Sequence, residues 1–129
     1  MPNIDDFNEE RLCEYKDEKY SVRDNGAILR YPKGTKARKL DNYFTFGKPK
    51  KHGYLEFAGV RVHRIVATAF HGEAPSKDYV IDHIDTNKQN NRVENLRWVT
   101  REENVLKNPL TIHKIEYIIG MSINEVRKN

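Results

Sequence analysis

The sequence predicts an α+β fold, with a small N-terminal antiparallel β region, then a ββα unit and a C-terminal helix. Three patterns lead to this prediction. In the first third of the chain, apolar and polar residues alternate around a turn at residues 24–26, as in a β-hairpin. In the second half, two short β runs flank a polar loop and precede a helix-start signal. Near the end, isoleucines recur at helical spacing.

The β elements are expected as a hairpin followed by shorter strands between basic loops. In chain order they are the hairpin at 19–31, a basic loop at 32–42, a third strand at 42–46, a second basic loop at 47–53, and one or two strands at 54–63. In the last of these segments, strand alternation puts Val60 and Val62 on one face and Arg61 and His63 on the other.

The second half of the chain carries the ββα pattern. The segment RIVATAFHG is predicted to be an apolar helix that stops at Gly72. The runs YVIDHID and NLRWVT are predicted strands, joined by the polar loop TNKQNNRVE. Thr100, followed by Glu103, has the form of a capping box, so a helix should start at Arg101 and end near Asn108. A further helix is expected to about residue 119.

Length and composition limit the kind of protein. The 129 residues fit one compact domain with a short appendage, and 37% of them are hydrophobic. The single cysteine, Cys13, excludes an internal disulfide and a zinc site built from several thiolates. It also suits a reducing, cytoplasmic setting. No apolar run approaches the roughly 18 residues of a membrane span, and the acidic N-terminus differs from a secretory signal. We therefore expect no membrane attachment.

The net charge of +4 is unevenly distributed. Residues 1–15 have a net charge of −4 and residues 16–64 have a net charge of +8. Residues 65–129 have no net charge. A basic region favours a polyanion because neutralised phosphates release counterions, although a solvated lysine-rich surface would have the same composition. The candidate nucleic-acid contacts are Lys33, Lys36, Arg38, Lys39, Lys48, Lys50, Lys51, Arg61 and Arg97.

Several residues of the ββα pattern match a known family at once. These are the pair Asp82-His83, the run NNRVENLRWVT and Asn104. With them the chain resembles the HNH nucleases of the ββα-metal group, and within that group the phage and intron-encoded homing endonucleases. The segment HRIVATAF matches what commonly precedes this motif, and YSVRDNGAILR resembles, more weakly, a small β module found ahead of it. The similarity spans about residues 15–108.

The resemblance assigns roles to individual residues. It implies that His83 is the general base and that Asn95, the middle Asn of the motif, bridges the loop and orients that base. It implies that Asp82 and Asn104 are ligands of a divalent metal ion, Mg²⁺ or Mn²⁺. The implied reaction is hydrolysis of double-stranded DNA to a 5′ phosphate and a 3′ hydroxyl. Asn at position 104 is usual in the homing-type subset and favours nicking or weaker metal binding over rapid, unspecific cleavage.

Elementary chemistry is consistent with these roles. A neutral imidazole with an intrinsic pKa of about 6.5 can take a proton from water near neutral pH. Carboxylate and amide oxygens suit a hard divalent cation, and a site with so few protein ligands leaves room for water and phosphate. One difficulty remains, because adjacent strand residues point to opposite faces. Asp82 and His83 share a site only if the strand ends or bends between them.

Other polar and aromatic residues of the motif have simpler interpretations. Asp85, Asn87, Asn90 and Asn91 are interpreted as loop formers. We expect a structural hydrogen-bonding role for His63. Trp98 and Phe70 are expected in the core.

The expected organisation has four parts and leaves some alternatives open. The parts are a polar lead-in with at most one short helix (1–13), a basic β-rich DNA-binding region (14–62), the HNH ββα nuclease core (63–108) and a helical tail (109–129). A non-catalytic DNA-binding module that retains the ββα fold is the alternative function, and an RNA-directed nuclease is a further one. The sequence leaves open whether one or both strands are cut, and whether a homodimer forms.

Overall fold

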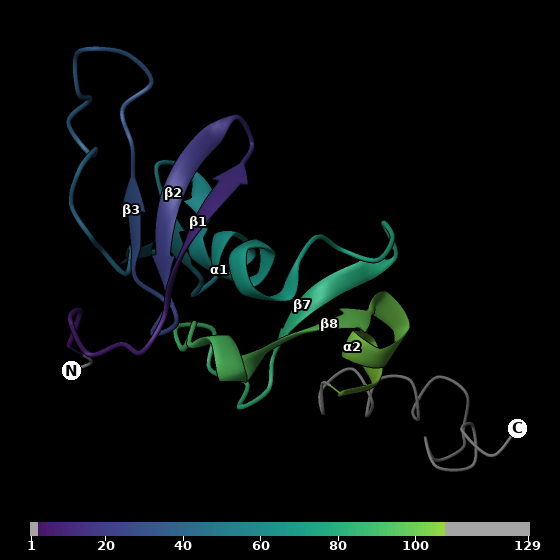
Figure 1. Ribbon diagram of the computed structural model, residues 1–129. Helices are drawn as coiled ribbons and strands as arrows, with labels where there is room; N and C mark the ends of the chain where they lie inside the picture. Colours follow the sequence, from purple (N-terminus) through teal and green to yellow (C-terminus); the bar gives the residue numbers. More distant parts are fainter. Residues whose placement is uncertain (1–2, 108–129) are drawn as a thin grey trace, which may run out of the picture.

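The structure is a computed structural model that describes residues 3–107. The expected helix near residue 119, and the expected end of the preceding helix at Asn108, lie outside these described residues. The chain forms two small antiparallel sheets, a central helix and a β-hairpin followed by a short helix (Figure 1). The predicted α+β class is confirmed. Within the described residues, no helix is long and apolar enough to cross a membrane.

The first sheet is a meander in the order β1-β2-β3, and its strands are β1 (Glu10–Tyr15), β2 (Glu18–Arg23) and β3 (Ile28–Arg30). The predicted hairpin corresponds to β2 and β3 and is confirmed. The predicted polar lead-in did not include β1. This strand is hard to recognise because its composition is polar and Leu12 is 78% exposed. Pairing of Cys13 with Tyr20 places the Cys13 side chain in the core, so tertiary contacts define the strand.

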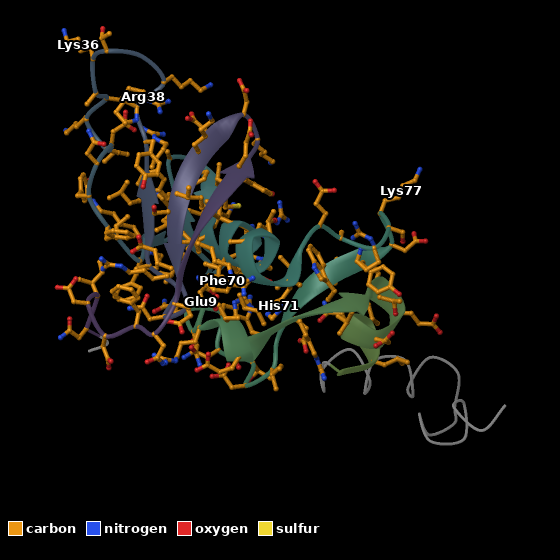
Figure 2. All side chains as sticks on the ribbon, in the orientation of Figure 1. Glu9, Lys36, Arg38, Phe70, His71 and Lys77 are labelled. Carbon is orange, nitrogen blue, oxygen red and sulfur yellow. The ribbon has the colours of Figure 1, made fainter. Side chains whose placement is uncertain are left out.

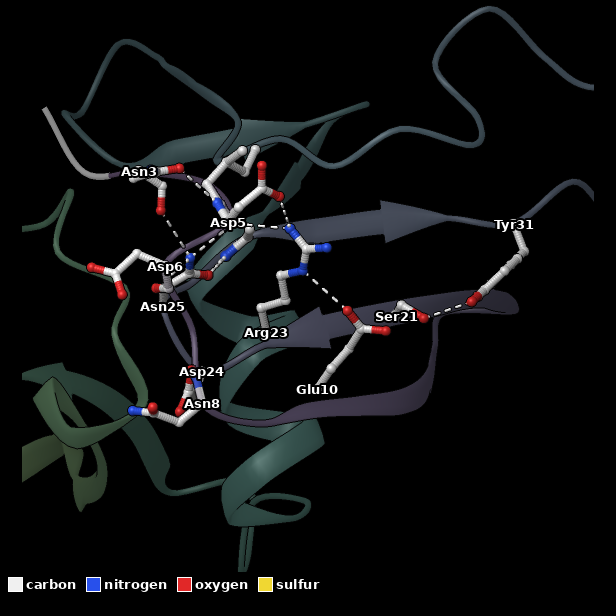
Figure 3. Close-up of polar contacts among 12 residues, drawn as sticks. Asn3, Asp5, Asp6, Asn8, Glu10, Ser21, Arg23, Asp24, Asn25 and Tyr31 are labelled. Carbon is white, nitrogen blue, oxygen red and sulfur yellow. Dashed lines mark hydrogen bonds and ion pairs between the residues drawn. The ribbon is translucent and has the colours of Figure 1, made fainter.

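The turn between β2 and β3 anchors the N-terminal segment to the sheet (Figure 3). The Asn25 amide Nδ2 donates to the backbone carbonyl oxygens of Asn3, Ile4 and Asp6 at 3.1–3.3 Å. Gly26 has a φ of 94°, and a Cβ there would lie 2.9 Å from the backbone oxygen of Asn91. Because glycine has no Cβ, this turn can approach the loop after residue 83, which contains Asn91.

The second sheet consists of β4 (Lys48–Pro49), β5 (Leu55–Phe57) and β6 (Val60–Arg61). One or two strands were expected in residues 54–63, and two, β5 and β6, are present. The strand expected at residues 42–46 is wrong, because only one bridge forms there, between Ile28 and Thr45. Helix α1 (Val62–His71) begins earlier than predicted. Val62 and His63 are therefore helical, and the predicted strand alternation fails at these two residues.

Helix α1 lies between the first sheet and the hairpin of β7 (Tyr79–His83) and β8 (Leu96–Thr100) (Figure 1). Its apolar side chains form the centre of the core with side chains from both sides of the helix. Apolar residues at helical spacing bury one continuous stripe, and this burial stabilises the helix in its place. The largest fully buried side chains of this core are those of Tyr20, Ile28, Ile65, Val22, Val62 and Val66.

Helix α2 (Arg101–Lys107) follows β8 directly and packs against both strands of the hairpin. Its start agrees with the predicted capping box. The Thr100 hydroxyl accepts from the backbone N–H of Glu103 at 3.2 Å and donates to the Glu103 carboxylate at 3.0 Å. A short 3₁₀ turn at Val93–Asn95 precedes β8. The ββα order predicted from the sequence is therefore present.

Candidate active site

His83 is the last residue of β7, and its imidazole is held by an asparagine from the following loop. The His83 Nε2 and Asn91 Oδ1 atoms are 2.8 Å apart in a buried contact. An amide oxygen only accepts hydrogen bonds, so Nε2 carries the proton of the neutral ring and the lone pair lies on Nδ1. Asn91 was interpreted only as a loop former. The structure adds a direct contact with the candidate base.

The loop after His83 is organised around one carboxylate. Asp85 accepts hydrogen bonds from the Asn90 side chain at 2.8 Å, the Asn87 backbone N–H at 2.8 Å and the Asn95 side chain at 2.9 Å. These hydrogen bonds, with that from Asn90 the strongest, lower the pKa of Asp85. The abundance of asparagine in this loop therefore has a structural cause.

Asn95 closes this loop at its far end. Its amide also donates to the Asn90 carbonyl at 2.8 Å and accepts from the Asp85 backbone N–H at 3.0 Å. Its backbone oxygen accepts from Ile84 N–H at 2.8 Å. Asn95 thus bridges the loop as the resemblance implies. The residue that accepts the hydrogen bond from the His83 ring Nε2 is Asn91, which lies in this loop.

Asp82 has a different neighbour from His83. Strand pairing continues through both residues, Asp82 opposite Arg97 and His83 opposite Leu96, so β7 does not end between them and strand alternation directs their side chains to opposite faces. The Asp82 carboxylate is 4% exposed and its Oδ2 accepts from Arg97 Nε at 2.9 Å. The Arg97 side chain is 53% exposed. This arginine therefore neutralises Asp82 from the solvent side and is not buried with it.

The donor set fits a hard divalent cation with few protein ligands. Asp82 has a buried carboxylate and Asn104 has an exposed amide on α2, the helix that packs on both strands, and both side chains offer oxygen donors of the kind that such an ion binds. Within residues 3–107, no cluster of three or more His, Cys, Asp or Glu side chains could hold a metal. Oxygen donors from one carboxylate and one amide leave most positions to water and phosphate, as Mg²⁺ prefers.

Two further rings pack around His83. The centroid of His63 lies 5.0 Å from that of His83 in an edge-to-face arrangement, and 5.0 Å from that of Tyr54 in a stacked one. His63 is 4% exposed, and its Nδ1 has no hydrogen-bond partner among the described residues. Burial, followed by nearby positive groups, lowers the pKa of His63 to about 3. His63 is thus a neutral packing residue, and the expected hydrogen bond is not made at Nδ1.

Cations lie on the outer ring of this cluster. The Arg61 guanidinium is 4.2 Å from the centroid of the Tyr54 ring, and Lys88 Nζ is 4.8 Å from it. The Lys88 ammonium also donates to the His52 backbone oxygen at 2.9 Å. The His63 and Tyr54 rings thus pack beside the candidate base, and two cations lie against Tyr54.

Comparison with known proteins identifies this part of the chain. A family model described as HNH endonuclease matches residues 60–106. Residues 60–106, the HNH segment, are therefore similar to the HNH endonuclease family. This HNH segment runs from β6 to α2 and contains His63, Asp82, His83, Asn95 and Asn104. The family resemblance drawn from the sequence is confirmed.

Individual relatives agree with this assignment. An uncharacterized HNH endonuclease of Acanthamoeba polyphaga mimivirus is 35% identical over 92 residues, covering 68% of this chain and 22% of the relative. DNA endonuclease I-HmuI of Bacillus phage SP01 is 51% identical over 45 residues, covering 35% of this chain and 25% of the relative. The chain thus spans about a quarter or less of the curated relatives it matches.

A solved structure is similar over more of the chain. It shows DNA binding and cleavage by the HNH homing endonuclease I-HmuI, with a TM-score of 0.51 and 30% sequence identity. The match covers 78% of this chain and 62% of the other. The likeness therefore extends beyond the HNH segment and supports the fold described above.

The candidate DNA contacts separate into paired and unpaired cations. Arg38 binds both carboxylate oxygens of Glu18, at 2.7 and 2.9 Å, and Asp41 at 3.0 Å. Lys33 pairs with Asp17 at 3.2 Å, and Arg97 pairs with Asp82. Figure 2 shows Lys36 and Arg38 on the long loop beyond β3, far from Lys77 near β7. The exposed candidates without an ion pair in the described region are Lys36, Lys39, Lys48, Lys50 and Lys51.

Proposed function

We propose that this chain is a metal-dependent DNA endonuclease of the HNH type, with His83 as the general base. The observation that carries the proposal is the contact of His83 Nε2 with Asn91 Oδ1 at the end of β7. This contact selects the tautomer with its lone pair on Nδ1, the form that a base requires. The similarity to I-HmuI, whose structure concerns DNA binding and cleavage, supports DNA as the substrate.

In the proposed reaction a water oxygen attacks the phosphorus and the bond to the 3′ oxygen breaks. The water proton moves to His83 Nδ1, the departing 3′ oxygen takes a proton from solvent water, and the products are a 5′ phosphate and a 3′ hydroxyl. Positioned proton transfer of this kind contributes roughly 10²–10⁴-fold to a rate. The His63 and Tyr54 rings restrict the imidazole by packing, and the Asn91 amide restricts it by hydrogen bonding.

Asp82 and Asn104 would hold the Mg²⁺ or Mn²⁺ ion. When bound, such an ion neutralises charge on the phosphate and on the departing oxygen. Arg97 occupies one oxygen of Asp82 and is half exposed, so it can turn outward to solvent or to a neighbouring phosphate. In this proposal Arg97 holds the Asp82 carboxylate in place before the ion binds.

The same ion pair supports one alternative. If Arg97 neutralises Asp82 permanently, the ββα unit is a DNA-binding module without catalysis. Cleavage assays distinguish the two functions.

The test is nicking of supercoiled plasmid with Mg²⁺ or Mn²⁺ by wild type, His83→Ala and His52→Ala. His52 is an exposed histidine on a loop, so its variant controls for loss of an imidazole. We expect open circles from wild type and His52→Ala, a rate at least 100-fold lower for His83→Ala, and no cleavage with a chelator. DNA binding by His83→Ala, followed by fluorescence anisotropy, should persist. Full cleavage by His83→Ala would refute the proposed mechanism, and binding without cleavage by wild type would favour the module.

A further inference from the structure

A cavity of about 500 Å³ lies beside the candidate active site. It is lined by residues of helix α1, strand β7, helix α2 and the loop that precedes β7. We call it the α1–α2 pocket. Its lining includes His63, whose ring contacts His83, and Asn104, the proposed metal ligand on α2. The pocket therefore adjoins the place where a scissile phosphate would lie.

The charge of the α1–α2 pocket is one-sided. Its cations are Arg61, Arg64, Lys77 and Arg101, and none of its described lining residues has a carboxylate. In residues 3–107, none of the ion pairs involves these four side chains, in contrast to Arg38 and Arg97. Unpaired cations around one cavity create a positive potential that attracts an anionic ligand. Multiple phosphates of a nucleic-acid strand match such a site better than a single small anion.

The walls of the pocket are aromatic. Tyr54, Tyr79 and Trp98 line it and are only partly buried. The Trp98 indole N–H donates to the Gly72 carbonyl oxygen at 3.2 Å, which holds this ring in place. Arginines that bind phosphate and aromatic rings that face sugar or base are the usual combination in sites for a nucleic-acid strand.

We propose that the α1–α2 pocket binds the sugar–phosphate backbone of the DNA strand that is cut, with Arg61, Arg64 and Arg101 as its phosphate contacts. The inference rests on the proposed function, which locates the scissile phosphate at His83. The basic loops between β3 and β5 then contact the duplex elsewhere. The pocket positions the cut strand next to His83 and Asn104.

The test compares charge-matched double variants of the full chain. The pocket variant combines Arg64→Gln with Arg101→Gln, and both of these arginines are exposed. The control combines Lys16→Gln with Lys19→Gln, two exposed cations at the turn between β1 and β2. A third variant, Arg64→Lys with Arg101→Lys, keeps the charge. Thermal denaturation followed by circular dichroism verifies that all of them fold.

Fluorescence anisotropy then gives the Kd of each protein for a DNA duplex in EDTA over a series of salt concentrations. Each lost phosphate contact lowers the slope of log affinity against log salt by about 0.9. The magnitude of this slope should therefore be smaller by roughly 2 in the pocket variant than in wild type. The control and the lysine variant should have the wild-type slope. An unchanged slope in the pocket variant would overturn the proposal.

A second measurement locates the contact on the strand. After the nick is mapped with wild type, the phosphates flanking it are replaced by neutral methylphosphonates in the cut strand or in the opposite strand. Wild type should bind the duplex with the substituted cut strand more weakly than the unsubstituted duplex. The pocket variant, whose affinity is already lower, should bind the two duplexes almost equally. Equal losses in both proteins would overturn the proposal. Pocket-dependent binding without any nicking would refute the nuclease function and retain the pocket as a DNA-binding site.

Discussion

At the scale of single residues, Asn91 links the loop geometry to the candidate base. Its carbonyl oxygen is the hydrogen-bond partner of His83 Nε2, and its Nδ2 has no partner in the described residues. The contact was not foreseen, because an asparagine in a polar loop is more often a turn former. The only available signal was the second asparagine of the Asn90-Asn91 pair.

We expect Asn91→Ala to reduce kcat about 10–100-fold with little change in KM, because His83 loses its orientation but the substrate contacts remain. In Asn91→Asp, a carboxylate beside the ring favours the protonated imidazole. The acidic limb of the pH–rate profile should therefore move to higher pH. Asn87→Ala, in the exposed part of the same loop, is the control. Identical pH profiles for wild type and Asn91→Asp would contradict the contact.

The lowered pKa of the buried His63 predicts that the free energy of unfolding depends on pH. In the folded protein the pKa of His63 is about 3, whereas the unfolded residue titrates near 6.5. Between these values the unfolded chain binds the extra proton, so the stability present above pH 6.5 is lost as pH falls toward 3. The titratable and charged groups facing His63 are His83, Arg64 and Arg61, and a positive charge on any of them opposes protonation of His63.

The measurement is the free energy of unfolding in urea between pH 6.5 and 5, above the range in which carboxylates titrate. Wild type should lose on the order of 1 kcal/mol per pH unit more than His63→Gln. Equal pH dependence in the two proteins would show that His63 is protonated in the folded state.

At the scale of elements, α2 is short and depends on its cap. In the first turn of α2, the Thr100 hydroxyl accepts from the Glu103 backbone N–H and donates to the Glu103 carboxylate. Asn104 is the next residue of this turn. The capping pattern is local, so the start of α2 was predictable from the sequence. The start of α1 was not, because Val62 is helical through its packing in the core and no capping side chain marks the boundary.

Thr100→Ala should lower the free energy of unfolding by about 1 kcal/mol, since it removes the N-cap hydrogen bond. It should also raise the Mg²⁺ concentration needed for half-maximal nicking, because α2 carries a proposed ligand. Thr100→Ser retains the hydroxyl and should behave like wild type in urea titration and in the metal titration. A metal requirement unaffected by Thr100→Ala would argue against Asn104 as a ligand.

At the scale of the whole molecule, the basic half of the chain divides into cations that hold the fold and cations that remain free. Arg38 and Arg30 both bind Asp41, whose side chain is fully buried. Burial alone would raise the pKa of Asp41, but hydrogen bonds from Arg30 and Arg38 outweigh it and lower the pKa to about 2. Arg38, a candidate DNA contact from composition, is therefore part of the scaffold of the long loop.

We expect Arg38→Gln to lower the Tm by several degrees, because it removes the ion pairs of Arg38 with Glu18 and Asp41 and leaves the buried Asp41 with Arg30 alone. In contrast, Lys36→Gln with Lys39→Gln should leave the Tm unchanged and reduce the salt dependence of DNA binding, with a slope smaller by roughly 2. Calorimetry and anisotropy at several salt concentrations distinguish the two. A stable Arg38→Gln protein with weakened DNA binding would return Arg38 to the set of DNA contacts.

The sequence by itself determined the α+β class, the hairpin at residues 24–26, the ββα order and the family, because these features depend on alternation, turn chemistry and capping between near neighbours. The tertiary structure alone decided that β1 is a strand, that Asn91 holds His83, that Arg38 and Arg97 are paired, and that Arg64 and Arg101 line one pocket. The physical reason is distance along the chain. These contacts join residues that are separated in sequence, and only the burial of a shared core brings them together.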